Sequence, residues 1–261
     1  MKIESLNPVR SFKGRGAEVL MAKHSPGDRI LCASAGNFGL AMAYSAHHRG
    51  VRVTLYAARN ANPLKLERMR DWGAEVRLFG EDFDAARAES RRAAREESGR
   101  LVVDSLDLET VEGAGTIGLE LLRLREPLDV LLVALGNGAL LNGVACAMKS
   151  HSSATKIIAV GAEGASAMVD SWRTGRIVER SRVSTIADGI AVRSPIPEAL
   201  DDMRGMVDGA ILVSDAQIIR GMQLLHRHVG IVPEPITALA SHTGSAPRAG
   251  KCRDRRWPPW R

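Results

Sequence analysis

Residues 29–39 read Arg-Ile-Leu-Cys-Ala-Ser-Ala-Gly-Asn-Phe-Gly, a short apolar run followed by a turn and the start of a helical pattern. The run from Arg29 to Ala33 has the length of a buried strand, and the segment from Asn37 to His48 has the length of a helix. This order of apolar run and amphipathic segment repeats along most of the chain. The alternation predicts an α/β fold with parallel sheets.

The repeat also predicts where the other elements lie. Further strands are expected at residues 51–56, 75–79, 102–103, 128–135, 156–162 and 211–213. Further helices are expected at residues 63–72, 81–97, 116–125, 139–149, 165–174 and 215–228, the last of them capped by Ser-Asp-Ala-Gln at residues 214–217. Residues 112–115, Glu-Gly-Ala-Gly, are expected to form a loop before the helix at 116. The continuous apolar run at 128–135 predicts a strand that is buried on both faces.

The composition is that of an ordinary globular protein, with 261 residues of which 45% are hydrophobic and 25% charged. No apolar run reaches the roughly 18 residues of a membrane-spanning helix, and the first residues lack the apolar core of a secretory signal. We therefore expect a cytoplasmic protein without a membrane partner. The three cysteines, Cys32, Cys146 and Cys252, are too few and scattered for a zinc site or a disulfide framework, so no metal is expected.

The basic balance comes almost entirely from the end of the chain. Residues 241–261 contain six arginines and lysines against one aspartate, so they supply +5 of the formal net charge of +6. The body of the chain is nearly neutral and contains no patterned basic helix, so we expect no nucleic-acid partner. With three prolines and no apolar periodicity, residues 241–261 are expected to form an irregular basic tail.

Residues 11–14, Ser-Phe-Lys-Gly, place one lysine at the expected start of a helix. The positive end of the helix dipole, together with partial burial beside Phe12, would favour the neutral amine of Lys13, which can attack a carbonyl group. A solvated surface lysine is the alternative that this stretch leaves open.

Two turns provide candidate anion sites. Residues 34–37, Ser-Ala-Gly-Asn, lie between a strand and a helix, where free backbone amides can surround a carboxylate, although Ser34 and Asn37 could also serve only as helix caps. Residues 136–140, Gly-Asn-Gly-Ala-Leu, follow a strand and open a helix, so their amides can converge on a phosphate. A tight turn without a ligand is the alternative for this second motif.

An amine, a carboxylate pocket and a phosphate cradle are together what pyridoxal phosphate requires. On these residues the chain resembles the fold-type II pyridoxal-phosphate enzymes, and most closely their serine/threonine dehydratase branch. The resemblance runs from about Lys2 to Ala240. It is also carried by Thr-Ile-Ala-Asp-Gly-Ile-Ala-Val at residues 185–192 and by Glu-Pro at 234–235, in the order that the family has.

The resemblance implies a role for each matched residue. Lys13 would hold pyridoxal 5'-phosphate as a Schiff base, with Phe12 beside the ring, and would act as the base at Cα. Asn37 would hydrogen-bond the 3-hydroxyl oxygen of the ring. The substrate carboxylate would be received by Ser34, Ala35, Gly36 and Asn37. The phosphate would be bound by Gly136, Asn137, Gly138, Ala139 and Leu140, and Gly189 would lie close to the ring.

The chain also departs from the family. It has Phe38 where dehydratases commonly carry histidine, and Asn137 and Ala139 where the phosphate loop is often all glycine. Only twelve residues precede Lys13, and no serine or threonine matches the partner of the pyridine nitrogen. These differences leave the substrate open and predict a dehydratase-like chain truncated at both ends, through loss of segments or a frame shift at the tail.

The implied fold has two three-layer domains with parallel sheets and the cofactor between them. Residues 29–112 would form the small α/β domain, residues 1–28 and 113–240 the large cofactor-binding domain, and residues 241–261 the tail. A homo-oligomer is left open, because missing ends would expose core residues.

The implied function is pyridoxal-phosphate-dependent β-elimination, which dehydrates and deaminates serine or threonine to a 2-oxo acid and ammonia. The partner is then a small amino-acid substrate. The alternatives are β-replacement, a threonine synthase-like reaction or racemisation on the same scaffold. An inactive remnant that acts as an interaction or regulatory protein is the alternative from another class.

Overall fold

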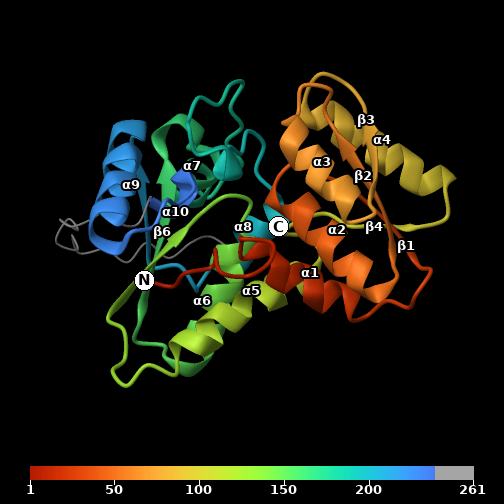
Figure 1. The fold of residues 1–261 in the computed structure, drawn as a ribbon. Helices are drawn as coiled ribbons and strands as arrows, with labels where there is room; N and C mark the ends of the chain where they lie inside the picture. Colours follow the sequence, from red (N-terminus) through yellow and green to blue (C-terminus); the bar gives the residue numbers. More distant parts are fainter. Residues whose placement is uncertain (239–261) are drawn as a thin grey trace.

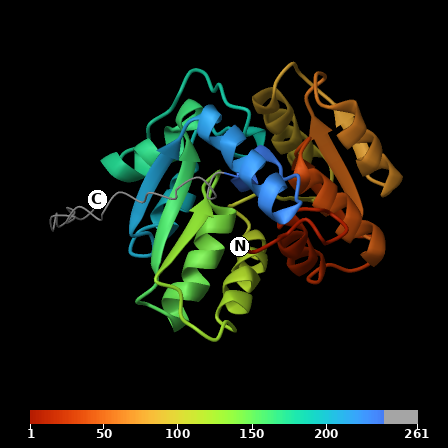
Figure 2. The ribbon, with the colours of Figure 1, turned by 60° about the vertical axis from the view of Figure 1, so that its left-hand side comes forward.

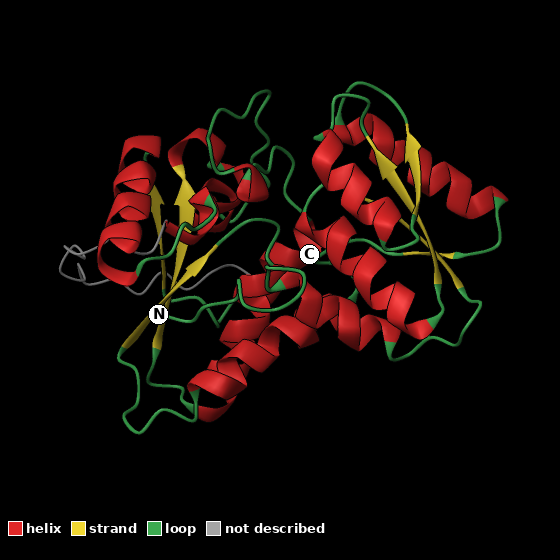
Figure 3. Cartoon of the chain, viewed as in Figure 1, coloured by secondary structure: helices red, strands yellow, loops and turns green. Residues whose placement is uncertain are grey.

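The computed structural model describes residues 1–238, which form two parallel sheets with helices around each (Figures 1 and 3). The first sheet has the order β3-β2-β1-β4 and contains β1 (Arg29–Ala33), β2 (Arg52–Ala57), β3 (Glu75–Leu78) and β4 (Arg100–Leu101). The second has the order β5-β6-β7 and contains β5 (Val130–Ala134), β6 (Lys156–Ala162) and β7 (Gly209–Val213). Every strand pair is parallel, which confirms the predicted α/β class. The expected tail at 241–261 lies outside the described residues.

The first sheet is covered on both faces. Its helices are α2 (Asn37–Arg49), α3 (Pro63–Asp71) and α4 (Phe83–Glu96). Because successive side chains of a strand point to opposite faces, Ile30 and Cys32 pack in one core with Met42 of α2, whereas Leu31 packs with Ala86 of α4. The sheet therefore lies between α2 with α3 on one side and α4 on the other.

The second sheet has the same three-layer arrangement. The helices around it are α5 (Leu108–Leu121), α6 (Ala139–His151), α7 (Ala167–Thr174), α8 (Pro197–Asp202), α9 (Asp215–Val229) and α10 (Pro235–Ala238). Ile157 packs with Leu141 of α6, while Val160 packs with Ile218 of α9 on the other face. The two sheets lie side by side, and α1 (Lys13–Met21) packs against both α2 and α5 between them (Figure 2).

The prediction that residues 128–135 are buried on both faces is wrong. The strand β5 is at the edge of its sheet, and Val130 is 49% exposed. The central strand is β6, where Ile157, Ala159 and Val160 are all fully buried. A continuous apolar run marks a strand in a parallel sheet but does not say whether a neighbour covers each edge.

The expected loop at residues 112–115 is also wrong, because α5 runs through it without interruption. Its glycines allow close helix packing: a Cβ on Gly113 would lie 2.4 Å from the backbone of Gly16 in α1, and one on Gly118 would lie 2.7 Å from Ala147 in α6. These glycines therefore act as spacers between three helices rather than as helix breakers. The predicted domain boundary at residues 112–113 falls inside α5, and the domain division stays a prediction.

Most of the other elements lie close to their predicted positions, whereas the short helices α8 and α10 were not predicted. Strand β4 is found two residues before the expected pair of valines, although the Val102 amide still donates to the Leu31 carbonyl at 2.8 Å. The expected cap of α9 is confirmed, since Ser214 and Gln217 form a reciprocal capping box.

Arg15 links α1 by hydrogen bonds to the first residues of the chain and to α5. Its guanidinium donates two hydrogen bonds to Glu4, at 2.7 and 2.9 Å, and one to Glu120 at 2.6 Å. Hydrogen bonds from Arg15, the larger cause, and from Lys2 lower the pKa of Glu120 from its ordinary value of 4.5 to about 2. Arg15 thus holds the helix that begins with Lys13.

Among residues 1–238, no helix is both long enough and apolar enough to cross a membrane.

The glycine contact between α1 and α5 leads to a stability prediction. We expect Gly113→Ala to lower the free energy of unfolding by about 3 kcal/mol or more, because the added Cβ meets backbone rather than a movable side chain. The matched control is Gly14→Ala, where a Cβ meets only the Val9 side chain, at 3.3 Å, and where higher helix propensity offsets the crowding. Urea unfolding measures both, and equal stabilities of the two variants would contradict the spacer role.

Candidate active site

Lys13 is the first residue of α1 and lies between two aromatic rings. Its Nζ is 4.7 Å from the ring centroid of Phe12 and 5.8 Å from that of Phe38, the residue that follows the Ser-Ala-Gly-Asn turn. Its side chain is 18% exposed. The aromatic faces attract a cation electrostatically, so the structure brings the lysine motif against the start of α2.

The main partner of Lys13 is Asp104, a residue outside every motif found in the sequence. The Nζ donates a hydrogen bond to Oδ2 of Asp104 at 2.5 Å, while Oδ1 of the same carboxylate is buried without a hydrogen-bond partner. Asp104 follows the short strand β4, and ligand sites of parallel sheets collect at the carboxyl ends of strands. The position of Asp104 after a strand was therefore the one sequence signal for a residue of the site. The neutral amine expected for Lys13 rested on the helix start and Phe12 alone, without a neighbouring carboxylate.

The Ser-Ala-Gly-Asn turn is organised by Ser34. Its Oγ accepts hydrogen bonds from the amides of Gly36, at 3.2 Å, and Gly39, at 3.0 Å. The side chain of Ser34 therefore shapes the turn, as the capping alternative expected. A Cβ on Gly36 would meet nothing within 4 Å, so the space beside the turn is open.

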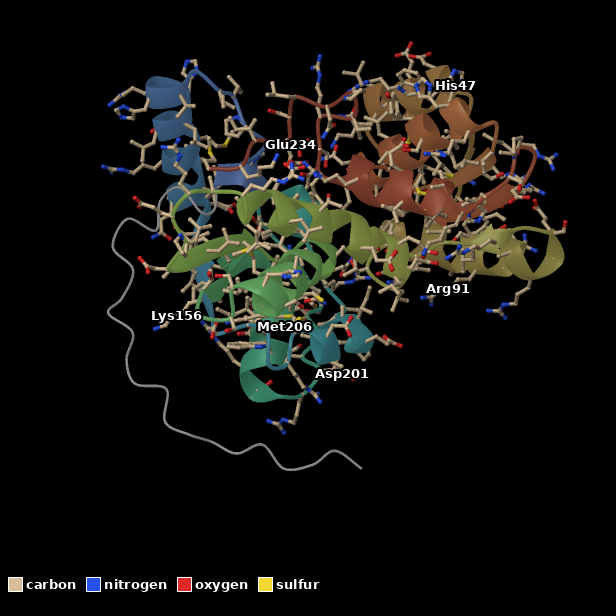
Figure 4. All side chains as sticks on the ribbon, turned by 90° about the horizontal axis from the view of Figure 1, so that it is seen from below. His47, Arg91, Lys156, Asp201, Met206 and Glu234 are labelled. Carbon is tan, nitrogen blue, oxygen red and sulfur yellow. The ribbon has the colours of Figure 1, made fainter. Side chains whose placement is uncertain are left out.

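Asn37 does not cap its helix. The N-cap residue of α2 is Gly36, and the Nδ2 of Asn37 instead donates to Oε2 of Glu234 at 2.8 Å. Glu234 belongs to the Glu-Pro motif near the end of the described chain, and Figure 4 shows it where the C-terminal segment meets the early helices. Two motifs that lie 197 residues apart in the chain are thus in direct contact.

Residues 136–140 form a turn into α6. Gly138 is the N-cap, with a φ of 104° that side chains rarely allow, and a Cβ there would lie 3.1 Å from that of Ala199. The amide of Ala139 donates to Oγ of Ser105 at 3.2 Å, which joins this turn to the residue after Asp104. A Cβ on Gly136 would lie 3.3 Å from the carbonyl oxygen of Gly189, so the stretch at residues 185–192 is adjacent to this turn.

The remaining predicted site residues are exposed to solvent to different degrees. Ala35, Asn137 and Leu140 are partly exposed, and Gly189 is exposed. Cys32 lies in β1 just before the first turn, and burial, followed by the negative charge of Asp104, raises the pKa of its thiol. A buried thiol with a raised pKa is a poor nucleophile, so Cys32 is not a candidate nucleophile.

A family model described as pyridoxal-phosphate dependent enzyme matches residues 1–256. The chain belongs to this family. Its cofactor is pyridoxal 5'-phosphate, as the resemblance implied.

Individual relatives agree with this assignment. An L-threonine ammonia-lyase from Thermotoga maritima is 33% identical over 238 residues, which cover 90% of this chain and 59% of that protein. The structure of the processed form of threonine deaminase isoform 2 from Solanum lycopersicum is similar with a TM-score of 0.87 and 28% identity, covering 92% of this chain and 71% of that one. The structure of maize serine racemase is similar with a TM-score of 0.86 and 27% identity, covering 92% and 74%. The chain spans about half the length of several curated relatives that it matches, between 41% and 60%.

The residues present fit the family's cofactor. Lys13 offers an amine between aromatic rings, Asn37 offers an amide donor, and α6 begins with a glycine N-cap that leaves helix-start amides open to a phosphate. The buried and unpartnered Oδ1 of Asp104 is a polar atom that a donor group on a ligand would satisfy.

The contact of Lys13 with Asp104 leads to a second prediction. A double-mutant cycle with Lys13→Ala and Asp104→Ala should give a coupling energy of about 1.5–3 kcal/mol in urea unfolding, the range for hydrogen bonds between charged groups. The control cycle uses Lys65 and Asp188, whose charged atoms are 3.7 Å apart and whose aspartate side chain is 77% exposed. There the coupling should stay below about 1 kcal/mol. Equal coupling in both cycles would contradict the close pairing.

Proposed function

We propose that the chain catalyses pyridoxal-phosphate-dependent β-elimination from serine or threonine, giving a 2-oxo acid and ammonia. The observation that carries the proposal is a chain of contacts through all three parts of the predicted site. Lys13 contacts Phe38 beside the carboxylate turn and pairs with Asp104, and the next residue, Ser105, accepts a hydrogen bond from the phosphate turn at Ala139. This arrangement supports one shared ligand for motifs that are far apart in the sequence.

In this proposal different residues bind different groups of the cofactor. Lys13 holds it covalently, with Phe12 beside the ring, and Asn37 donates its amide to the ring oxygen. The backbone amides of residues 136–140 bind the phosphate at the positive end of α6. Gly189, which has no side chain to intrude, borders the ring.

The reaction follows from where the amine lies. The bound cofactor withdraws electrons from Cα of the amino acid and so makes its proton acidic. Once the amino group of the substrate has displaced it from the cofactor, Lys13 would accept that proton at Nζ, and the amides of the turn at 34–37 would hold the substrate carboxylate in place. Phe12 and Phe38 shield the amine from water. The β-hydroxyl leaves as water, and hydrolysis then releases ammonia and the 2-oxo acid.

A racemase reaction is the second candidate, because the similarity to maize serine racemase is nearly as high as that to the tomato threonine deaminase. Both reactions begin with removal of the Cα proton, and they differ in what happens next. A cytoplasmic location and self-association stay predictions.

The binding role of Lys13 can be tested by absorbance. Adding pyridoxal 5'-phosphate to the folded protein should produce a visible absorption band that is absent in Lys13→Ala, because only a covalent link to the amine gives it. Lys23→Ala is the matched control, since Lys23 is half exposed and follows the same helix. A band that persists in Lys13→Ala would refute the assignment.

The reaction can be identified by its products. We expect 2-oxo acid and ammonia from L-serine or L-threonine in equal amounts, measured by a dehydrogenase-coupled assay, and loss of both in Lys13→Ala. Chiral chromatography of the remaining amino acid measures racemisation in the same samples. D-amino acid as the main product would favour the racemase reading over elimination.

A further inference from the structure

Ser105 carries a structural feature that the proposed roles leave unexplained. Its backbone has a φ of 72°, a left-handed conformation that is uncommon for residues other than glycine. The turn is held from both sides, because the amide of Ser105 donates to Oγ1 of Thr110 at 3.2 Å and the preceding Asp104 pairs with Lys13. Such strained backbone persists where the surroundings fix it, and it concentrates at functional sites.

The strained turn directs the Ser105 hydroxyl at the phosphate turn. The residue is 4% exposed, and its Oγ lies 3.2 Å from the amide nitrogen of Ala139, the first residue of α6. Of the first amides of α6, this is the one that receives a side-chain acceptor, since the N-cap Gly138 has no side chain to offer. The hydroxyl therefore lies beside the helix-start amides at which a phosphate oxygen would bind.

The hydroxyl of Ser105 has an unused donor. Its oxygen accepts from Ala139, and no acceptor for its own proton occurs within residues 1–238. A buried hydroxyl without an acceptor is costly, and a phosphate group offers only acceptors and carries a charge of about −1.5 to −2.

We propose that Ser105 is a phosphate-binding residue, whose hydroxyl donates to a phosphate oxygen of the cofactor beside the helix-start amides of α6. The proposal rests on the proposed function for the existence of the cofactor site. It adds a side-chain ligand to a cradle otherwise made of backbone amides, and this ligand comes from the connection between β4 and α5 rather than from the glycine turn.

Binding measurements on the full chain test this assignment without relying on activity. Cofactor-free protein is dialysed to equilibrium against pyridoxal 5'-phosphate and, separately, against pyridoxal, which lacks the phosphate. In Ser105→Gly, which removes the hydroxyl and also accepts the positive φ, the Kd for pyridoxal 5'-phosphate should rise about tenfold or more, as for loss of one charge-assisted hydrogen bond. The Kd for pyridoxal should change less than about twofold.

The comparison of the two ligands separates a phosphate contact from a general loss of structure. Ser105→Ala serves as a second variant without the hydroxyl, and Ser90→Ala, which removes a buried hydroxyl that donates to the Arg87 carbonyl in α4, serves as the control. A fold defect weakens the binding of both ligands alike and leaves the ratio of the Kd for pyridoxal to the Kd for pyridoxal 5'-phosphate unchanged. Loss of a phosphate donor lowers this ratio. An unchanged ratio of the two Kd values in both Ser105 variants would overturn the proposal and leave the proposed function standing, whether or not the visible absorption band of the cofactor is weaker. Failure of the unaltered protein to bind either ligand would overturn both.

Discussion

The close packing of α1, α5 and α6 through glycine is the constraint on which the site depends. Gly113 of α5 meets the backbone of α1, and Gly118 meets α6 on another side of the same helix. Because α1 begins with Lys13 and α6 begins after Gly138, the spacing of these helices sets the distance between the amine and the phosphate turn. The connection before α5 carries Asp104 and Ser105, so one helix with its leading turn holds the parts of the site together.

The order of strands and helices could be predicted because each element is short and locally periodic. The strand β6 and the capped start of α9 were found at their predicted positions, since apolar runs and capping residues act within a few neighbours. The errors came from residues whose meaning depends on distant contacts. The glycines of α5 indicate a loop when read alone, and only the approach of two other helices makes them compatible with a helix. In the same way, the apolar run of β5 cannot report that it lies at a sheet edge.

Parts of the candidate site could be proposed from the sequence where the residues carry chemistry in their identity and order. The sequence pointed to Lys13, Asn37 and the glycine turns because an amine, an amide and helix-start turns occur along the chain in the order that the family has. Asp104 and Ser105 escaped because an aspartate and a serine after a weak strand are ordinary loop residues. Their importance comes from tertiary contacts to Lys13 and Ala139, which no local pattern encodes.

The way in which the helices are capped distinguishes the site from the rest of the fold. Helices α3, α4 and α9 begin with Asn62, Asp82 and Ser214, whose side chains accept the hydrogen bonds of their own first amides. Among α1 to α9, glycine is the N-cap residue only in α2 and α6. A side-chain cap stabilises a helix by about 1 kcal/mol relative to alanine at the N-cap. Replacing such a cap with glycine lowers the stability by only a few tenths of a kcal/mol. In α2 the amide of Gly39 donates to Ser34, and in α6 the amide of Ala139 donates to Ser105, so at these two starts the side-chain acceptor comes from outside the N-cap position. A glycine N-cap leaves room beside the remaining first amides, where the carboxylate and phosphate of the proposed ligands would bind.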